Sequence, residues 1–223
     1  MVMEDNMAKT NVLILLGGQW HDFEGFAAAW RAILEGKGCS IKVTYDFEAL
    51  THIKELNCDL LLSYTCLTEP PVGAKPGSPT KFSDAQTKAL VGWVQRGGAL
   101  LAAHAATVIG DSDPALERLL GGAFEKHPPQ FTFTVLPLSA QHPITDGIEA
   151  FDVYDELYIE RYHPSVMVHM IAVYEQVAYP MAWSKREGQG RVAHIALGHS
   201  DRVWELEPYQ RLMFQTIQWL LKG

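Results

Sequence analysis

The chain has 223 residues, and its 48% hydrophobic content suits a single domain with one sizeable core. Acidic residues outnumber basic ones by 26 to 18, which gives a formal net charge of -8 and argues against nucleic acid or an anionic membrane as a partner. The three cysteines cannot all pair and lack a metal-type Cys-x-x-Cys spacing, so we expect reduced thiols in a cytoplasmic protein.

The first ten residues are polar and acidic, and we expect them to be disordered. They lack the apolar stretch of a signal peptide, and no apolar run in the chain has the length of a membrane span. Residues 11–223 are therefore expected to form a single α/β domain.

The first half of the chain alternates apolar runs with amphipathic segments, which predicts a parallel β-sheet with helical crossovers. Helices are expected over 23–35, over 47–56, and after Ser83, where Gln86 occupies the capping-box position. The loop over 65–81 is long and rich in proline, which suggests a functional lid or an edge flap. Parallel strands are predicted near residues 11–16, 40–45, 59–63 and 99–104.

The second half changes to alternating patterns that are typical of antiparallel strands. A hairpin turn is predicted over 186–190, and an amphipathic helix over 209–221. The expected strands of this half cover 130–137, 150–160, 166–174, 179–185 and 191–197.

Two histidines stand where predicted buried strands end. His104 follows the apolar run 99–103, and His199 follows the run 191–198. In open α/β sheets, ligands bind at the carboxyl ends of the strands, so we expect these two imidazoles to meet in one cleft. His194 lies five residues before His199, and the strand period of two points it to the opposite face, so it is interpreted as structural.

Four segments of the chain stand in this order: GGALLAAHAAT at 97–107, DELY at 155–158, PMAW at 180–183, and the run from GRV at 190–192 to ALGH at 196–199. In order and spacing these segments resemble the ThuA-like (trehalose-utilisation) family, and the match spans nearly the whole chain. The resemblance implies a flavodoxin-like sandwich of the class I glutamine amidotransferase type, with a parallel central sheet and antiparallel additions in the second half. It also implies a role in sugar metabolism, with oxidised (keto) sugar derivatives as the substrate class.

The same resemblance removes one activity. In the amidotransferases a cysteine occupies a sharp strand-to-helix turn, and a His-Pro-Glu segment supplies the base. Here His104 occupies the turn, and the second segment reads His199-Ser200-Asp201. The fold and the cleft are therefore expected without glutaminase activity. Cys66 is the only thiol near a carboxyl edge of the predicted sheet, and no base stands at a fixed spacing from it.

Further candidates lie near the same edge of the predicted sheet. His21 follows the first strand, and the family resemblance supports it, since ThuA-like chains often carry a histidine there. Asp22 and Glu24 are interpreted as caps of the following helix. Strand parity does not decide whether Asp155 or Glu156 faces the cleft, but the match to the family's Asp-Glu-Leu-Tyr segment favours Glu156.

Aromatic residues are the candidates for substrate binding, because their faces suit the apolar face of a sugar ring. Trp20, Tyr158 and Trp183 are proposed for this role, with core packing as the alternative for each. The other histidines are expected to be structural or solvent-facing: His52, His127, His142, His163 and His169.

His104, His199 and Glu156 are the candidate catalytic residues, and His21 completes a candidate set of metal ligands with them. Imidazole and carboxylate ligands suit Zn, Mn, Fe or Ni. A bound divalent metal could polarise the ketone oxygen of a keto sugar. Without a metal, His104 and His199 could serve as an acid/base pair near neutral pH.

Two classes of function follow. The first is an enzyme that acts on a carbohydrate derivative such as a keto sugar or keto glycoside, as a hydrolase, isomerase or lyase. The alternative is a non-catalytic sugar-binding or partner-docking module on an amidotransferase-like fold. The sequence leaves open the exact substrate, the reaction and whether the chain forms a homo-oligomer.

Overall fold

The computed structural model describes residues 10–68, 80–110, 113–138 and 142–222. Within these residues, helices cover both faces of a nine-stranded sheet. In sheet order the strands are β2 (Ser40–Thr44), β1 (Asn11–Gly18), β3 (Leu60–Cys66), β4 (Ala99–Ala103), β11 (Gly190–Ile195), β10 (Val177–Glu187), β9 (Met167–Tyr174), β6 (Phe131–Pro137) and β7 (Phe151–Asp155). The α-helices are α1 (Phe23–Glu35), α2 (Asp84–Gln95), α3 (Pro114–Leu120), α4 (Asp201–Trp204) and α5 (Glu207–Leu221).

The parallel half of the sheet has the strands that the sequence predicts. β1 pairs in parallel with β2 and β3, and β4 pairs in parallel with β3 and β11. β3 and β4 are buried along their whole length because helices cover both faces, which accounts for their continuous apolar sequence. The predicted capping box at the start of α2 is also confirmed, with Ser83 and Gln86 bonding each other's backbone amides.

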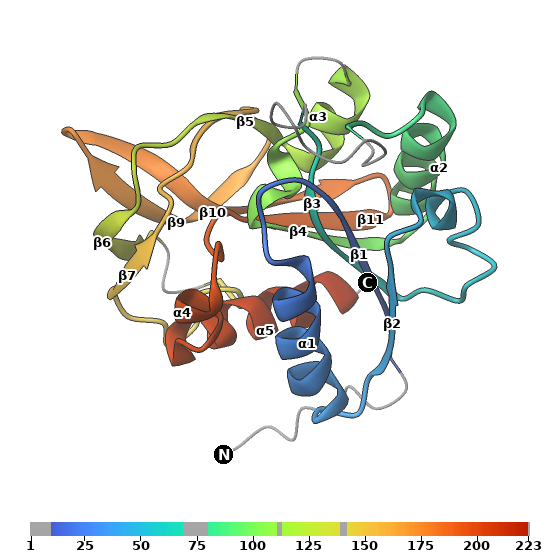
Figure 1. Cartoon of the computed structure of the whole chain (residues 1–223), viewed down its shortest axis with the longest axis horizontal. Helices are drawn as coiled ribbons and strands as arrows, with labels where there is room; N and C mark the ends of the chain where they lie inside the picture. The colour runs from blue at the N-terminus through green and yellow to red at the C-terminus, as the bar shows by residue number, and fades with distance from the viewer. Residues whose placement is uncertain (1–9, 69–79, 111–112, 139–141, 223) are drawn as a thin grey trace.

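Two apolar cores lie on opposite faces of the sheet. Figure 1 shows α1, α4 and α5 on one face and α2 and α3 on the other. Trp30 of α1 and Tyr209 of α5 belong to the first core, and Trp93 of α2 and Leu116 of α3 belong to the second. Each helix therefore packs one apolar stripe against the sheet, as its periodicity predicts.

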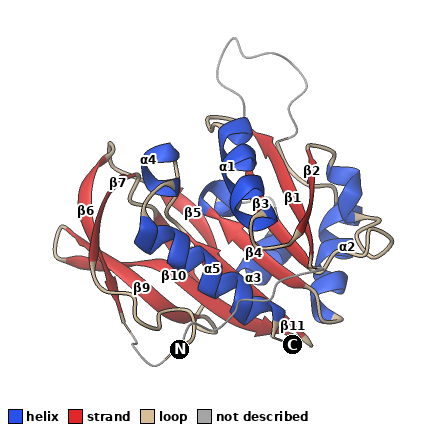
Figure 2. Ribbon diagram, turned by 90° about the horizontal axis from the view of Figure 1, so that it is seen from below, coloured by secondary structure: helices blue, strands red, loops and turns tan. Residues whose placement is uncertain are grey.

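The antiparallel half continues the sheet on the side away from β2, as Figure 2 shows for β6, β7 and β9, and α4 packs against β7. β10 and β11 form the predicted hairpin, and β9 pairs antiparallel with both β10 and β6. β6 pairs antiparallel with β7 at the edge. A separate two-stranded sheet contains β5 (Gly122–Lys126) and β8 (Ile159–Tyr162).

The single strand predicted over 150–160 is wrong. The chain leaves the large sheet after β7 and joins the small sheet at β8, so residues 156–158 form no strand pairing. The physical reason is a tertiary contact: the Asp155 carboxylate accepts hydrogen bonds from the backbone of Gly198 and His199, which holds the chain at the end of β7. Alternation in the sequence continues across this break and conceals it.

The helix predicted over 47–56 is shorter than expected. Only residues 47–50 form a helical turn, of the 3₁₀ type, and hydrogen-bonded turns follow. Phe47 and Leu50 are both buried, and their spacing of three suits the 3₁₀ period. The predicted lid over 65–81 lies largely outside the described residues, as do residues 1–9. No helix in the described parts of the chain is long and apolar enough to cross a membrane.

Candidate metal centre and active site

Three histidines and one glutamate meet at the carboxyl edge of the parallel strands. His21 follows β1, His104 follows β4, His199 follows β11, and Glu156 follows β7. One possible ligand atom from each of these four residues lies within 4.8 Å of the others. The ring centroids of His104 and His199 are 5.6 Å apart, so the prediction that these two imidazoles meet is confirmed.

Backbone carbonyls orient two of the imidazoles. His104 Nδ1 donates to the carbonyl of Ala196 at 2.6 Å, and His21 Nδ1 donates to the carbonyl of Gln19 at 3.0 Å. Each ring therefore presents Nε2 to the cluster, and among the described residues both Nε2 atoms are buried without a hydrogen-bond partner. Metal-binding histidines typically use this arrangement, with one ring nitrogen donating to a carbonyl and the other free to bind the metal.

The Glu156 carboxylate lies between the other two ligand nitrogens. Its Oε2 atom is 3.5 Å from His104 Nε2 and 3.3 Å from His199 Nδ1. Burial raises the pKa of Glu156, but the interactions with His104 and His199 outweigh burial and hold that pKa below its usual range. The same contact raises the pKa of His199 against the opposite effect of burial. The cluster therefore favours an ionised carboxylate.

The pKa of His21 shifts in the opposite direction from that of His199. Burial, with a smaller contribution from His104, lowers the pKa of His21 to about 3. The imidazole is therefore neutral at physiological pH, and its Nε2 lone pair is available. Metal ions bind neutral imidazole, so this shift suits a ligand position.

The structure also decides between the two neighbouring carboxylates. Asp155 turns away from the cluster and accepts hydrogen bonds from the amides of Gly198 at 2.7 Å and His199 at 3.2 Å. Gly198 has a φ of 121°, which favours glycine, and its carbonyl accepts from Trp204 Nε1 at 2.7 Å. Asp155 thus holds the turn that carries His199, and Glu156 enters the cluster.

The sequence of almost the whole chain matches the model of one protein family. The model of the ThuA family, described as trehalose utilisation, matches residues 4–220. The chain belongs to the ThuA family. No significant match was found among the curated proteins.

Solved structures share the fold. A ThuA-like protein from Bacteroides uniformis has a TM-score of 0.77 and 17% identity, with 96% of this chain and 92% of the other covered. One from Parabacteroides merdae has a TM-score of 0.79 and 14% identity, with 96% and 91% covered. A β-galactosidase from Bacillus circulans has a TM-score of 0.62 and 7% identity, and the match covers 96% of this chain but 31% of the enzyme. At these identities the similarity concerns the fold alone.

In this ThuA family member the turn after β4 is strained at His104. The residue has a φ of 44° at the start of the 3₁₀ helix His104–Thr107. A left-handed conformation costs a non-glycine residue roughly 1–2 kcal/mol, so surrounding contacts must hold it. Cys66 does not substitute for a nucleophile at this turn, because burial raises the pKa of its thiol to about 12.

The three aromatic residues predicted to stack on a sugar differ in their exposure and in their contacts. Trp20 is 63% exposed beside His21, and its role in substrate binding stays a prediction. Tyr158 is buried, and its ring stacks on that of His104 with centroids 4.3 Å apart, so it forms the wall behind the cluster. For Trp183 the prediction is wrong: its indole is buried and donates to the carbonyl of Leu120, so it belongs to the core.

His127 is the residue that sequence reasoning missed. Its Nε2 atom lies 3.8 Å from Glu156 Oε1, the oxygen that does not face His104 and His199. Its side chain is 35% exposed, so it stands on the solvent side of the cluster. The one available signal was its place directly after β5, but the following proline is equally typical of an ordinary loop.

The other histidines of the ThuA chain lie outside the four-residue cluster. His52 and His163 are exposed, and the rings of His142 and His169 contact each other with centroids 4.2 Å apart. His194 is fully buried, and its Nε2 lies 3.2 Å from Glu160 Oε2. These placements agree with the structural or solvent-facing roles expected for them.

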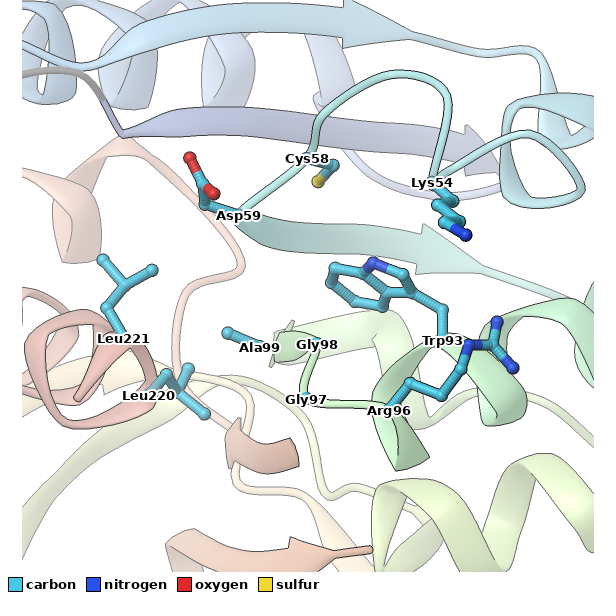
Figure 3. Close-up of a pocket in the computed structure, with 10 residues that line it drawn as sticks. All are labelled: Lys54, Cys58, Asp59, Trp93, Arg96, Gly97, Gly98, Ala99, Leu220 and Leu221. Atoms are coloured by element: carbon cyan, nitrogen blue, oxygen red, sulfur yellow. The ribbon is translucent and has the colours of Figure 1, made fainter. Parts of the chain in front are cut away.

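A pocket of about 500 Å³ lies at the opposite edge of the sheet, where β3 and β4 begin. Figure 3 shows Trp93, Lys54 and Arg96 around it. The C-terminal ends of α2 and α5 also line this pocket, and their negative dipole ends oppose an anionic ligand there. The pocket contains no histidine, so the candidate chemistry belongs to the carboxyl edge.

Proposed function

We propose that this ThuA family member is a sugar-metabolism enzyme that holds a divalent transition metal and acts on a keto sugar derivative. The observation that carries the proposal is the convergence of His21, His104, His199 and Glu156, with one ligand atom each inside 4.8 Å. The family description, trehalose utilisation, supports sugar as the substrate class.

The four donors fit a transition metal. Three imidazole nitrogens and a carboxylate oxygen suit Zn, Mn, Fe or Ni. The neutral state of His21 and the carbonyl contacts of His21 and His104 satisfy the usual requirements of ligand histidines. When bound, the metal would supply Lewis-acid polarisation of a ketone oxygen.

The side chains around the cluster would handle substrate and protons. His127 Nδ1 donates to the carbonyl of Pro128 at 2.8 Å, which leaves Nε2 facing Glu156 Oε1 at the solvent side. A substrate hydroxyl placed there could exchange a proton with His127 Nε2. The exposed indole of Trp20 would bind the apolar face of the sugar ring.

A non-catalytic sugar-binding module is the second candidate. It is favoured by His104 at the turn where the amidotransferases carry cysteine, since that replacement removes the chemistry of the related enzymes. In this case the cluster would recognise the oxygens of a sugar without converting it.

The test is a metal titration followed by a sugar assay. We expect the chelator-treated protein to bind one equivalent of Zn(II), Mn(II), Fe(II) or Ni(II), and metal at about 100 times its Kd to stabilise the fold by about 2.7 kcal/mol. NMR should then show consumption of a keto glycoside, but not of its unoxidised parent, by the metal-loaded protein. Sugar binding without turnover would favour the second candidate, and failure to bind any of the metals would refute the metal centre.

Metal affinity should fall as the pH is lowered through the raised pKa of His199. The metal must displace a proton from His199, so below that pKa we expect about a tenfold loss of affinity per pH unit, and above it little change. His21 should contribute no dependence until the pH approaches 3, because it is already neutral. Competition titrations between pH 5 and 8 measure the slope. A constant affinity across this range would show that His199 is not a ligand.

A further inference from the structure

The segment from Glu156 to Glu160 lies along the 3₁₀ helix that begins at His104, and every second residue faces it. Glu156 Oε2 is 3.5 Å from His104 Nε2, and the ring of Tyr158 stacks on the His104 ring. Two residues further, Glu160 Oε1 accepts a hydrogen bond from Thr107 Oγ1 at 2.6 Å. One short segment therefore contacts both ends of the turn that carries His104.

Glu160 lies at a position where burying a carboxylate costs free energy. Its side chain is 1% exposed, and burial of a charged or polar carboxyl requires partners. Its second oxygen lies 3.2 Å from Nε2 of His194, which is itself fully buried. A leucine or methionine would fill this space without the desolvation penalty, so packing alone does not account for a glutamate here.

His194 ties Glu160 to the strand that ends at His104. His194 Nδ1 donates to the carbonyl of Ala102 in β4 at 3.0 Å, and His104 Nδ1 donates to the carbonyl of Ala196 after β11. Two hydrogen bonds from histidine side chains thus join the ends of the neighbouring strands β4 and β11, one donated from each side. Both bonds lie next to the turn at which His104 leaves the sheet.

The strained conformation of His104 explains why such a network is needed. Its φ of 44° persists only if contacts on both sides determine it. β4 fixes the residues before His104, and the Thr107 hydroxyl, held by Glu160, fixes the end of the 3₁₀ helix after it. The direction of His104 Nε2 depends on this backbone geometry.

We infer that Glu160, acting through Thr107, is a positioning residue that fixes the turn at His104 and so aims His104 Nε2 at the metal cluster. The inference rests on the proposed metal centre. Groups that orient a metal ligand in this way typically change metal affinity by 10- to 100-fold when they are removed.

Thr107→Val tests the inference, because it removes the hydroxyl and keeps the shape of the side chain. We expect this variant to bind Zn(II) about 10- to 100-fold more weakly than the wild-type chain in competition titrations. Thr107→Ser restores the hydroxyl and should recover wild-type affinity to within about threefold. Thr216→Val is the matched control, since it removes another buried threonine hydroxyl, bonded to the carbonyl of Leu212 in α5, and should leave Zn(II) affinity unchanged.

A second readout needs no metal. In the metal-free protein, NMR should show the His104 Nδ1 proton exchanging with solvent about tenfold faster in Thr107→Val than in the wild type or in Thr216→Val. Thr107→Val could instead lower the melting temperature while Zn(II) affinity and proton exchange keep their wild-type values. That result would show that Glu160 and Thr107 have a structural role only. Failure of the wild-type chain to bind Zn(II) or another metal would refute the metal centre instead, and the exchange rates would still decide whether Glu160 positions His104.

Discussion

His199→Ala should abolish metal binding while leaving the fold almost intact. His199 contributes one of the four ligand atoms, so we expect its loss to weaken metal affinity by at least about a hundredfold. Removal of a group that only hydrogen-bonds a metal ligand typically weakens affinity by about 10- to 100-fold, and loss of the ligand itself should cost no less. Its side chain is 24% exposed, and the bond from its backbone amide to Asp155 survives the substitution. The free energy of unfolding should therefore fall by only about 1 kcal/mol, because Glu156 keeps His104 and His127 as neighbours. Isothermal titration and thermal unfolding measure the two effects.

The matched control is His163→Ala, which removes an exposed loop histidine bonded to Ser165. We expect this variant to keep both metal affinity and stability. His104→Ala is a less clean probe than its position at a strand end suggests, because its side chain is fully buried and its loss leaves the Ala196 carbonyl unpaired. Wild-type metal affinity in His199→Ala would remove this residue from the site.

His194→Ala should have the largest effect on stability. Its removal leaves Glu160 Oε2 buried with no polar atom opposite it and leaves the Ala102 carbonyl without its imidazole donor, and a buried polar group left unpaired typically costs about 1–3 kcal/mol. For a chain of this size the melting temperature should fall by roughly 2 to 12 °C. The effect on metal affinity should not exceed that of Thr107→Val, because His194 reaches His104 only indirectly, through Glu160 and through the Ala102 carbonyl of β4. Thermal and urea unfolding measure the loss.

Glu160→Gln in the His194→Ala background is the internal check. The neutral amide avoids the cost of burying a carboxyl group with no polar atom opposite it, so the double variant should be more stable than His194→Ala alone. The structural and functional assignments of the two histidines would be reversed if His194→Ala kept the wild-type melting temperature and His199→Ala unfolded the protein.

Local sequence patterns predict most of the parallel half because most strands and helices there obey one period, the segment over 47–56 being the exception. The β3 and β4 runs are apolar throughout since both faces are covered, and the α1 stripe faces one core. The same reasoning fails at 150–160, where alternation continues through a change of sheet. It also fails for Trp183, because an aromatic residue near a motif has the same sequence signal in a core and in a binding site.

The sequence by itself determined the α/β architecture, the placement of His104 and His199 at strand ends, and the absence of a cysteine at the turn. These features depend on short-range periodicity and on residue identity. The tertiary structure alone decided that Glu156 rather than Asp155 enters the cluster, that His127 faces it, and that Glu160 supports Thr107. Each of these depends on which distant backbone amide, imidazole or hydroxyl lies opposite a carboxylate. Only the tertiary fold sets that, because it brings the segments after β5, β7 and β11 and the 3₁₀ helix after β4 together.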